Sequence, residues 1–276
     1  MAPPLVDGAW LSEHISDAGL RVLDLRWYLD KPGRPAYLAG HIPGAVFVAL
    51  EDITGARGDG RHPLPGGDQF QAAMRRAGVN RDARVIVYDD LGGYSAARLW
   101  WLFRYFDRDV ASVLDGGLAA WRGELATGEE PAPAEGDFVA GERQGEMVLA
   151  RDEVLAGLGS LRLVDARAGE RYRGEIEPVD RRAGHIPGAA NVPWSANLGP
   201  DKRFLPPPEL RARYEAAGIR AGGPNAAYCG SGVSACVDLL ALEVAGIHGV
   251  KLYAGSWSDW SAHPELPLET GSGQRG

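Results

Sequence analysis

The stretch 229–235 reads Cys-Gly-Ser-Gly-Val-Ser-Ala and combines a thiol with glycines and hydroxyls. An apolar run typical of a strand precedes it at 225–228, and a run typical of a helix follows at 236–242. Glycines let the backbone turn tightly between the two, and the amides at a helix start favour negative charge in such a turn. We therefore expect Cys229 to react as a thiolate nucleophile. The alternative is a buried cysteine in an ordinary glycine-containing turn.

Composition and charge limit the class of protein. The chain has 276 residues, of which 45 % are hydrophobic and 24 % charged, as in globular proteins. A net charge of −8 argues against non-specific nucleic-acid binding, which needs a basic surface. It does not argue against a small anionic substrate, because a local cluster of arginines can oppose the overall sign.

Cysteine usage points to a reducing environment. Cys229 and Cys236 are too few for a disulfide framework or a thiolate metal site, and the sequence predicts no metal and no cofactor. Cys236 is predicted to be buried, with a resolving thiol as the alternative. A reactive thiolate suits a reducing compartment. Because residues 1–7 lack the features of a signal peptide and no apolar run approaches ~20 residues, we expect a cytoplasmic protein without a membrane partner.

Strand-like and helix-like runs alternate along the chain. Apolar runs typical of buried strands occupy 21–25 and 84–89, and an apolar run typical of a helix occupies 95–106. This alternation predicts an α/β fold with a central, mainly parallel sheet flanked by helices on both faces.

The order of motifs then repeats. Residues 162–167 repeat the pattern of 22–26, and Gly-His-Ile-Pro-Gly-Ala occurs around His41 and again around His185. A repeat of this length predicts two domains of similar fold.

We place the domain boundaries by composition. The segment 126–147 contains a run rich in Gly, Pro, Ala and Glu without helical or strand periodicity, and it is predicted to be a linker. The N-terminal domain then covers 1–125 and the C-terminal domain 148–276. The first domain has Asp89 in the turn that corresponds to Cys229. We therefore expect the first domain to be non-catalytic.

These features together resemble the tandem rhodanese-type sulfurtransferases. The resemblance rests on two Asp-containing strands, each followed by Gly-His-Ile-Pro-Gly-Ala, and on a cysteine loop in the second copy alone; it covers roughly 5–270. In that family, thiosulfate sulfurtransferases typically read Cys-Arg-Lys-Gly-Val-Thr in the loop. The mercaptopyruvate branch typically reads Cys-Gly-Ser-Gly-Val-Thr. This chain is similar to the second branch, with Ser234 for the last Thr.

The resemblance implies two rhodanese-like domains and a sulfur-transfer reaction. Sulfane sulfur would pass from 3-mercaptopyruvate through a persulfide on Cys229 to cyanide or to a thiol acceptor such as thioredoxin, and pyruvate would be released. The alternative donor is thiosulfate. In either case the small sulfur donor is anionic.

Several loop residues have implied roles. The amides of Gly230, Gly232, Val233 and Ser234 are expected to stabilise the thiolate and the persulfide, both of which are negatively charged. Ser231 takes the place of the cation in the thiosulfate branch, so its hydroxyl is expected to bind a carbonyl or thiol of an organic donor. The alternative is that Ser231 merely fits the tight turn.

The resemblance also suggests a histidine and an acid for Ser231. In the mercaptopyruvate branch, a histidine of the first copy contacts the loop serine and an upstream aspartate orients it. His41 is the candidate here, and Asp30 is the candidate acid, since Asp24 is expected to end a core strand. The alternative for His41 and for His185 is structural: a ring that hydrogen-bonds backbone and fixes the turn before a proline.

Arg171 matches the arginine that holds the donor's carboxylate or sulfonate, and a guanidinium suits a carboxylate. The alternative is a solvated loop arginine. The branch often has a second arginine in Pro-Glu-Pro-Arg, where this chain has Val179. Arg181 and Arg182 are the nearby candidates to replace it, which leaves the preferred donor open.

Two other functional classes were weighed. Cysteine phosphatases also use an anion-binding cysteine loop, but they need Cys-x5-Arg, and the corresponding position is Ala235. A non-catalytic sulfur carrier would keep the cysteine but depend on a partner for turnover.

Overall fold

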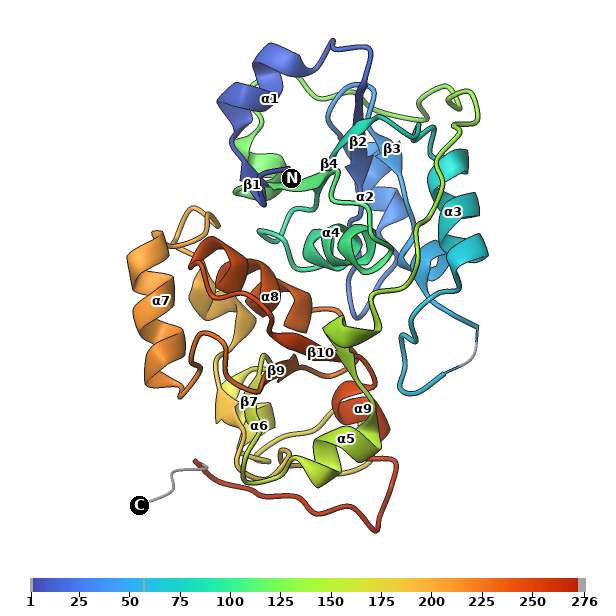
Figure 1. The fold of residues 1–276 in the computed structure, drawn as a ribbon. Coiled ribbons are helices and arrows are strands. Elements are labelled where there is room, and N and C mark those ends of the chain that lie inside the picture. Colours follow the sequence, from blue (N-terminus) through green and yellow to red (C-terminus); the bar gives the residue numbers. More distant parts are fainter. Residues whose placement is uncertain (1, 57, 273–276) are drawn as a thin grey trace. The chain divides into compact units, whose positions relative to one another are not determined.

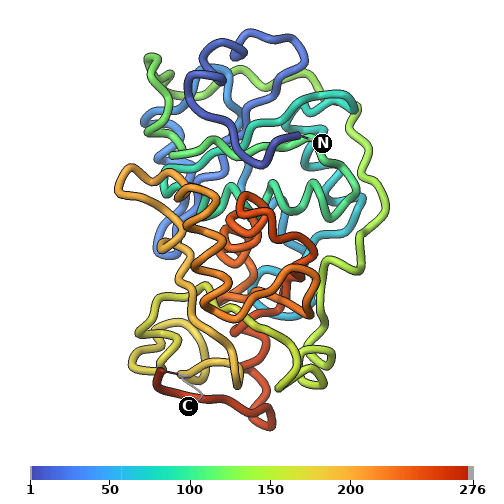
Figure 2. The backbone as a smooth tube through the Cα atoms, turned by 60° about the vertical axis from the view of Figure 1, so that its left-hand side comes forward, coloured from blue at the N-terminus to red at the C-terminus, as the bar shows by residue number. Residues whose placement is uncertain are grey.

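The computed structural model describes residues 2–56 and 58–272, which form two compact units (Figures 1 and 2). Unit 1 comprises Met1–Gly55, Pro65–Gln144 and Gly199–Phe204. Unit 2 comprises Ala56–Leu64, Gly145–Leu198 and Leu205–Gly276. Each unit therefore includes a short segment from the other half of the sequence.

Unit 1 contains a parallel sheet with the strand order β1-β5-β4-β2-β3. Its strands are β1 (Leu5–Val6), β2 (Leu20–Asp24), β3 (Val46–Phe47), β4 (Arg84–Tyr88) and β5 (Ala111–Leu114). The strands β2 and β4 pair along their whole length, and Asp24 lies opposite Tyr88 at the end of both. The carboxyl ends of the parallel strands therefore meet at one edge, which is where the following turns begin.

Helices cover the sheet of unit 1. They are α1 (Gly8–His14), α2 (Arg34–Ala39), α3 (Gly67–Arg76) and α4 (Ala96–Tyr105), with the 3-10 turns η1 (Leu50–Ile53) and η2 (Gly117–Ala120). The side chain of Asp7 caps α1 by accepting a hydrogen bond from Trp10 N at 2.7 Å. Alternate residues of β4, Ile86 and Tyr88, pack in one core cluster with Leu11 of α1.

Unit 2 repeats this sheet, with the strand order β6-β10-β9-β7-β8. Its strands are β6 (Val148–Leu149), β7 (Arg162–Asp165), β8 (Ala190–Asn191), β9 (Asn225–Tyr228) and β10 (Lys251–Tyr253). Asp165 lies opposite Tyr228, as Asp24 lies opposite Tyr88. The equal register confirms the predicted repeat and aligns Cys229 with Asp89, because each residue directly follows the paired tyrosine.

The helices of unit 2 are α5 (Arg151–Ala156), α6 (Gly169–Tyr172), α7 (Pro207–Ala216), α8 (Ala235–Val244) and α9 (Ser256–Trp260), with the 3-10 turns η3 (Gly145–Met147) and η4 (Trp194–Asn197). In Figure 1, α7 and α8 lie on one side of this sheet, and α5, α6 and α9 lie on the other. The first two turns of α8 are buried all round, in keeping with their apolar sequence. Within residues 2–56 and 58–272, the structure contains no helix of the length and apolarity that crossing a membrane requires.

The expected α/β architecture with flanking helices is confirmed in both units. The expected domain boundaries differ from the observed units in three places, one of which is Gly199–Phe204, expected in the second domain but part of unit 1. Most of the segment expected to be a linker, up to Gln144, belongs to unit 1, and Phe138 within it is 0 % exposed against the rings of Phe70 and Phe103. The segment Ala56–Leu64, expected in the first domain, belongs to unit 2.

Candidate active site

Cys229 lies at the turn between β9 and α8, as the sequence predicts. Its side chain is buried, and its Sγ accepts a hydrogen bond from the N–H of Gly232 at 3.1 Å. Gly232 has a φ of +78°, and a Cβ there would lie 2.6 Å from the carbonyl oxygen of Ala254. Only glycine fits this position, since the turn needs both a left-handed backbone and a close approach.

The same turn in unit 1 is occupied by a carboxylate. Asp89 accepts hydrogen bonds from the N–H groups of Leu91 at 2.8 Å, Gly93 at 2.9 Å, Ser95 at 2.8 Å and Ala96 at 2.9 Å. The turn is therefore an anion-binding cradle of backbone amides. Burial raises the pKa of Asp89, and these four N–H groups act in the opposite direction.

The repeat places Cys229 at the start of the equivalent cradle in unit 2. By the repeat, the positions that match those four amides are 231, 233, 235 and 236, of which Val233 is one of the predicted loop amides. The N–H of Cys236 donates to Val233 O at 3.1 Å instead. An aspartate side chain extends one heavy atom beyond the position of a cysteine Sγ. A second sulfur bonded to Cys229 would therefore correspond to a carboxylate oxygen of Asp89.

Ser256, which lies in the turn after β10, fixes the backbone of Cys229. Its Oγ accepts a hydrogen bond from Cys229 N at 3.2 Å and donates to Tyr253 O at 2.9 Å. Ser256 has a φ of +54°, a conformation that glycine favours, and the equivalent residue in unit 1 is Gly117 with a φ of +60°. A serine in this backbone costs about 1 kcal/mol, which the two hydrogen bonds offset. Sequence reasoning did not single out Ser256.

Ser231 contacts a histidine, but not the one expected. The Oγ of Ser231 lies 2.8 Å from Nδ1 of His62, whose segment Ala56–Leu64 is part of unit 2. The pair couples a hydroxyl to a base beside the thiol, two residues from Cys229. Sequence reasoning missed His62.

The structure gives His41 different partners, all in unit 1. Its Nδ1 lies 2.9 Å from Tyr37 O, its Nε2 lies 3.3 Å from Glu130 Oε1, and its ring stacks on Tyr37. His185 repeats this arrangement with Tyr172, at 2.8 Å from Nδ1 to the carbonyl oxygen. Both histidines thus have the structural environment that was the alternative in the sequence interpretation.

The two aspartates considered with His41 both lie in unit 1. Asp30 is exposed in the bend that follows β2 in unit 1. Asp24 ends β2, as expected, and forms a buried ion pair with Arg26 at 2.7 Å. Asp165 and Arg167 form the same pair in unit 2, at 2.6 Å.

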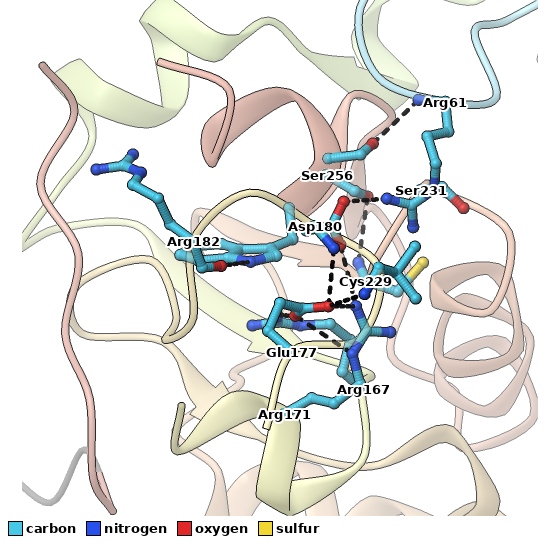
Figure 3. Close-up of polar contacts among 12 residues, drawn as sticks. Arg61, Arg167, Arg171, Glu177, Asp180, Arg182, Cys229, Ser231 and Ser256 are labelled. Carbon is cyan, nitrogen blue, oxygen red and sulfur yellow. Dashed lines mark hydrogen bonds and ion pairs between the residues drawn. The ribbon is translucent and has the colours of Figure 1, made fainter. Parts of the chain in front are cut away.

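Arg171 lies in α6 and joins a cluster of charges near the cysteine loop (Figure 3). Its Nη2 lies 2.6 Å from Glu177 Oε1 and 3.0 Å from Asp180 Oδ2. Burial opposes ionisation of Glu177, but hydrogen bonds from Arg171 and from the N–H of Asp180 hold its pKa below the usual range. The side chain of Arg171 is 17 % exposed, so it is not a solvated loop arginine.

The backbone of Gly230 lies close to the guanidinium groups of two arginines. A Cβ on Gly230 would lie 3.4 Å from Nη1 of Arg171 and 3.0 Å from Nη2 of Arg61. Glycine at 230 therefore lets two guanidinium groups approach the backbone next to Cys229. The remaining predicted loop residue, Ser234, occupies the N-cap position of α8 without a side-chain capping hydrogen bond and is buried.

Unit 2 thus brings together Cys229, Ser231, the loop glycines and Arg171, whereas His41 and Asp30 lie in unit 1. The sequence model of the rhodanese-like domain matches residues 7–124 and 150–263. The chain therefore belongs to the rhodanese-like family and carries the domain twice, which confirms the resemblance and the fold.

Particular relatives extend the match over nearly the whole chain. The chain is 39 % identical to 3-mercaptopyruvate sulfurtransferase of Escherichia coli, covering 96 % of this chain and 97 % of the relative. It is 46 % identical to the Mycobacterium tuberculosis protein named "Putative thiosulfate sulfurtransferase SseB", covering 91 % of each. The crystal structure of SseA from Escherichia coli, one of the 3-mercaptopyruvate sulfotransferases, superposes with a TM-score of 0.82 at 38 % identity, over 93 % of this chain and 100 % of that chain.

Proposed function

We propose that the protein is a sulfurtransferase that moves sulfane sulfur from 3-mercaptopyruvate through a persulfide on Cys229 to a thiol or cyanide. The observation that supports this proposal is the turn that begins at Cys229, whose counterpart in unit 1 surrounds the carboxyl group of Asp89 with backbone N–H donors. A persulfide is an anion of the same reach. The names of the relatives add support for sulfur transfer as the reaction.

In the first half-reaction, the Cys229 thiolate attacks the sulfur of the donor. The new S–S bond forms as the C–S bond of mercaptopyruvate breaks, and the electron pair of that bond passes to the departing carbon. The enolate of pyruvate results and takes up a proton, which the persulfide can supply from the former thiol of the donor. The persulfide anion then lies among the amides of residues 231–236.

Ser231 and His62 act on the ketone end of the donor. As the C–S bond breaks, negative charge develops on the ketone oxygen of the enolate. The Ser231 hydroxyl donates a hydrogen bond to this oxygen, and His62, 2.8 Å from Ser231 Oγ, exchanges the proton of that hydroxyl. Arg171 binds the carboxylate of the same donor.

In the second half-reaction, an acceptor thiolate or cyanide attacks the outer sulfur. The S–S bond breaks and its electron pair returns to Cys229, so the thiolate is regenerated. A protein thiol such as thioredoxin is the acceptor we propose for the cell, in the reducing environment of the cytoplasm. Neither Cys229 nor Cys236 forms a disulfide in the described part of the chain, which is compatible with that environment.

Thiosulfate is the second candidate donor. Two guanidinium groups, those of Arg61 and Arg171, lie beside Gly230 and would suit a doubly charged anion. The name of the mycobacterial relative points the same way. Ser231 favours mercaptopyruvate, because it places a hydroxyl where the thiosulfate branch has a cation.

The donor comparison tests the proposal. Purified protein is assayed with cyanide as acceptor and with each donor in turn. We expect kcat/KM to favour 3-mercaptopyruvate by at least about tenfold, which corresponds to ~1.4 kcal/mol in transition-state binding. Equal or better use of thiosulfate would assign the protein to the thiosulfate donor instead.

Cys229→Ser is the matched control for this experiment. Mass spectrometry of the wild type after donor treatment should show a gain of about 32 Da, the mass of one sulfur bonded to the nucleophile. The variant should show neither that gain nor turnover, and Cys236→Ser should show both. A sulfur adduct on Cys229→Ser would place the nucleophile elsewhere.

A further inference from the structure

Unit 2 contains a cavity away from the cysteine loop, at the open edge of its sheet. The cavity has a volume of about 580 Å³ and lies between the edge strand β8 and the C-terminal end of α7. Arg162, which also lines it, begins β7, whereas the turn of Cys229 follows the opposite end of the sheet. Three residues of strand, about 10 Å, separate Arg162 from Asp165 at that end. The cavity is therefore separate from the candidate active site, and its volume is in the range of small-molecule sites.

Two arginines line this cavity, Arg162 and Arg213 of α7. Among the described residues, neither side chain has a hydrogen-bond or ion-pair partner, although the chain has 37 acidic residues against 29 basic ones. The Nε of Arg213 is buried. A buried donor without an acceptor is destabilising, so such groups are rare in folded proteins. The cavity thus presents two guanidinium groups whose hydrogen-bonding capacity is not used by the described part of the chain.

The equivalent of Arg162 in unit 1 does have a partner. That residue is Arg21, since both lie three positions before the aspartate that ends the strand. The Nε of Arg21 donates to the carbonyl oxygen of Gly78, which follows α3, at 3.1 Å. Gly218 follows α7 in the same left-handed conformation, and a Cβ on it would lie 4.0 Å from Cδ of Arg162. Arg162 thus has the same neighbour as Arg21, but no described residue binds its guanidinium group.

Arg213 has no arginine as its counterpart in unit 1. The helices α3 and α7 both have 10 residues and are both followed by an alanine and a glycine, so Arg213 aligns with Ala73. Ala73 is buried in unit 1. In α7 the buried residues are Leu210 and Tyr214, so the packing of this helix does not depend on the arginine. The second guanidinium group is therefore an addition to the repeat, at the same cavity as the first.

The edge of β8 adds backbone groups to the cavity. The N–H of Val192 donates to Asp165 O at 3.1 Å, so the backbone of residue 192 faces β7. Successive residues of a strand direct their N–H and C=O groups to opposite sides, and Asn191 therefore directs its own to the open edge. Asn191 lines the cavity together with Ala189 and Ala190. A ligand in the cavity can thus reach a backbone N–H and small apolar side chains as well as the two guanidinium groups.

We propose that this cavity is a binding site for a small organic anion. The carboxylate or phosphate oxygens of the ligand accept hydrogen bonds from Arg162 and Arg213, and its apolar part packs on the alanines of β8 and α7. Guanidinium groups suit both kinds of anion, because their planar set of donors matches two oxygens at once. An anion shared by the two arginines also gives an acceptor to the buried Nε of Arg213. The site does not depend on the proposed sulfur transfer at Cys229.

The test follows the Nε–H signals of Arg162 and Arg213 in NMR spectra of protein labelled with ¹⁵N-arginine. Inorganic phosphate and succinate are the probes, titrated at constant ionic strength, and they distinguish a phosphate from a carboxylate. We expect a saturable shift of both signals with at least one probe. Arg162→Gln and Arg213→Gln should each raise the dissociation constant at least about tenfold, measured on the remaining arginine signal, because the hydrogen bonds of one guanidinium group are lost.

Arg211→Gln is the matched control, since it removes the same charge from α7, where Arg211 pairs with Glu215 on the surface. It should change the dissociation constant by less than about twofold, as expected for an exposed charge. Thermal melting confirms that each variant is folded. Because Arg162 is exposed at the start of β7, Arg162→Gln keeps the comparison possible if Arg213→Gln is unfolded.

Three results would overturn the proposal. Shifts that rise in proportion to both probes without saturation would make Arg162 and Arg213 ordinary solvated arginines. Equal weakening of binding in Arg211→Gln would show attraction by net charge rather than a site. Loss of binding in Arg171→Gln, with Arg162→Gln and Arg213→Gln unaffected, would place the anion at the cysteine loop instead.

Discussion

At the scale of single residues, the turn after β4 and the turn after β9 differ mainly in the side chain that occupies the cradle of backbone amides. Asp89 fills it with a carboxyl group that accepts hydrogen bonds from four backbone N–H groups. In the proposed mechanism, Cys229 leaves the cradle to be filled by the sulfur that it takes from the donor. The division of labour between the copies thus follows from one side chain in each.

The contact between Ser231 and His62 leads to a prediction about donor preference. Ser231→Ala removes the hydrogen bond to the developing enolate, so kcat/KM for mercaptopyruvate should fall on the order of 10²-fold. The value for thiosulfate, which has no ketone, should change by less than about threefold. His62→Gln should have a similar effect, and the double variant should be little worse than either single one. Steady-state assays with both donors measure this.

His41→Gln is the control for that prediction, because the sequence suggested His41 as the partner of Ser231, whereas the structure shows His62 in contact with Ser231. The ring of His41 is buried and engaged with Tyr37 and Glu130. We expect its substitution to lower the melting temperature while the ratio of the two donors stays as in the wild type. Loss of donor preference in His41→Gln, with His62→Gln unaffected, would restore the original assignment.

The residues that could be predicted are those with a local signal. Cys229, Ser231 and the loop glycines are contiguous, and their spacing carries the turn and the chemistry. His62 and Arg61 lie in a loop of Gly, Asp and Pro that has no periodicity, so nothing local says where their side chains point. The available signal was indirect: two adjacent basic side chains in a loop rich in glycine and proline, and a missing arginine at 179.

At the scale of elements, the segment Ala56–Leu64 determines whether the site is complete. It brings His62 to Ser231 and Arg61 to Asp180. Gly60 has a φ of +76° and lies in close contact with Gly255 and Ser258. The close contact sets how near the segment approaches the turn before α9.

Substitution of Gly60 tests that role. Gly60→Ala should push the segment away from Gly255 and lower kcat/KM for mercaptopyruvate about 10- to 10²-fold, because catalytic groups are sensitive to shifts of ~1 Å. Gly128→Ala is the matched control, since Gly128 has a φ of +83° but nothing within 4 Å of its Cβ position. In both variants an alanine must adopt a left-handed backbone conformation, which destabilises the fold by about 1 kcal/mol. Equal activity of the two variants would contradict the prediction.

The helix α8 carries a buried acid behind the cysteine loop. Asp238 is 0 % exposed and accepts one hydrogen bond from Asn197 at 2.8 Å, while its Oδ2 has no hydrogen bond among the described residues. Burial raises the pKa of Asp238 well above its usual value, Asn197 acts against this, and the negative charge of a Cys229 thiolate adds to it. The folded protein thus favours the neutral carboxyl.

A pH dependence follows from the raised pKa of Asp238. The unfolded chain releases this proton near pH ~4, whereas the folded chain retains it to higher pH. Wild-type stability from this group is therefore complete below pH ~4 and is lost as the pH rises toward the folded pKa. Asp238→Asn has no such loss. Its free energy of unfolding should therefore rise relative to that of the wild type as the pH increases. The rise corresponds to a change of up to about tenfold in the unfolding equilibrium constant per pH unit.

Urea unfolding at several pH values between 4 and 7 measures this difference. Asp152→Asn is the control, because that side chain is 91 % exposed in α5. Its stability relative to the wild type should not follow the same course. A difference for Asp238→Asn that stays constant with pH would contradict the assignment of a neutral carboxyl.

At the scale of the whole molecule, the repeat made the fold predictable. Two runs of matching strands and Gly-His-Ile-Pro-Gly motifs predicted two parallel sheets, and the register of β2 with β4 and of β7 with β9 confirms them. The boundaries between units were harder, since composition shows where regular elements stop but not what the irregular chain packs on. Phe138 is the clearest case: a single aromatic residue in a Pro- and Gly-rich stretch, buried in unit 1.

The segment Ala56–Leu64, which comes from the first half of the sequence but belongs to unit 2, also affects when the site can form during synthesis. The hydrogen bond from Arg61 N to Ser258 Oγ joins residues 197 positions apart. A ribosome adds about 5–20 residues per second, so Arg61 and His62 leave it ~10–40 s before Ser258 is made. During that interval the nascent chain contains Arg61 and His62 but lacks Ser258, to which Arg61 is hydrogen-bonded in the folded protein. The reactive site therefore cannot be assembled until almost the whole chain has been synthesised, which delays sulfur chemistry on Cys229 until folding is nearly complete.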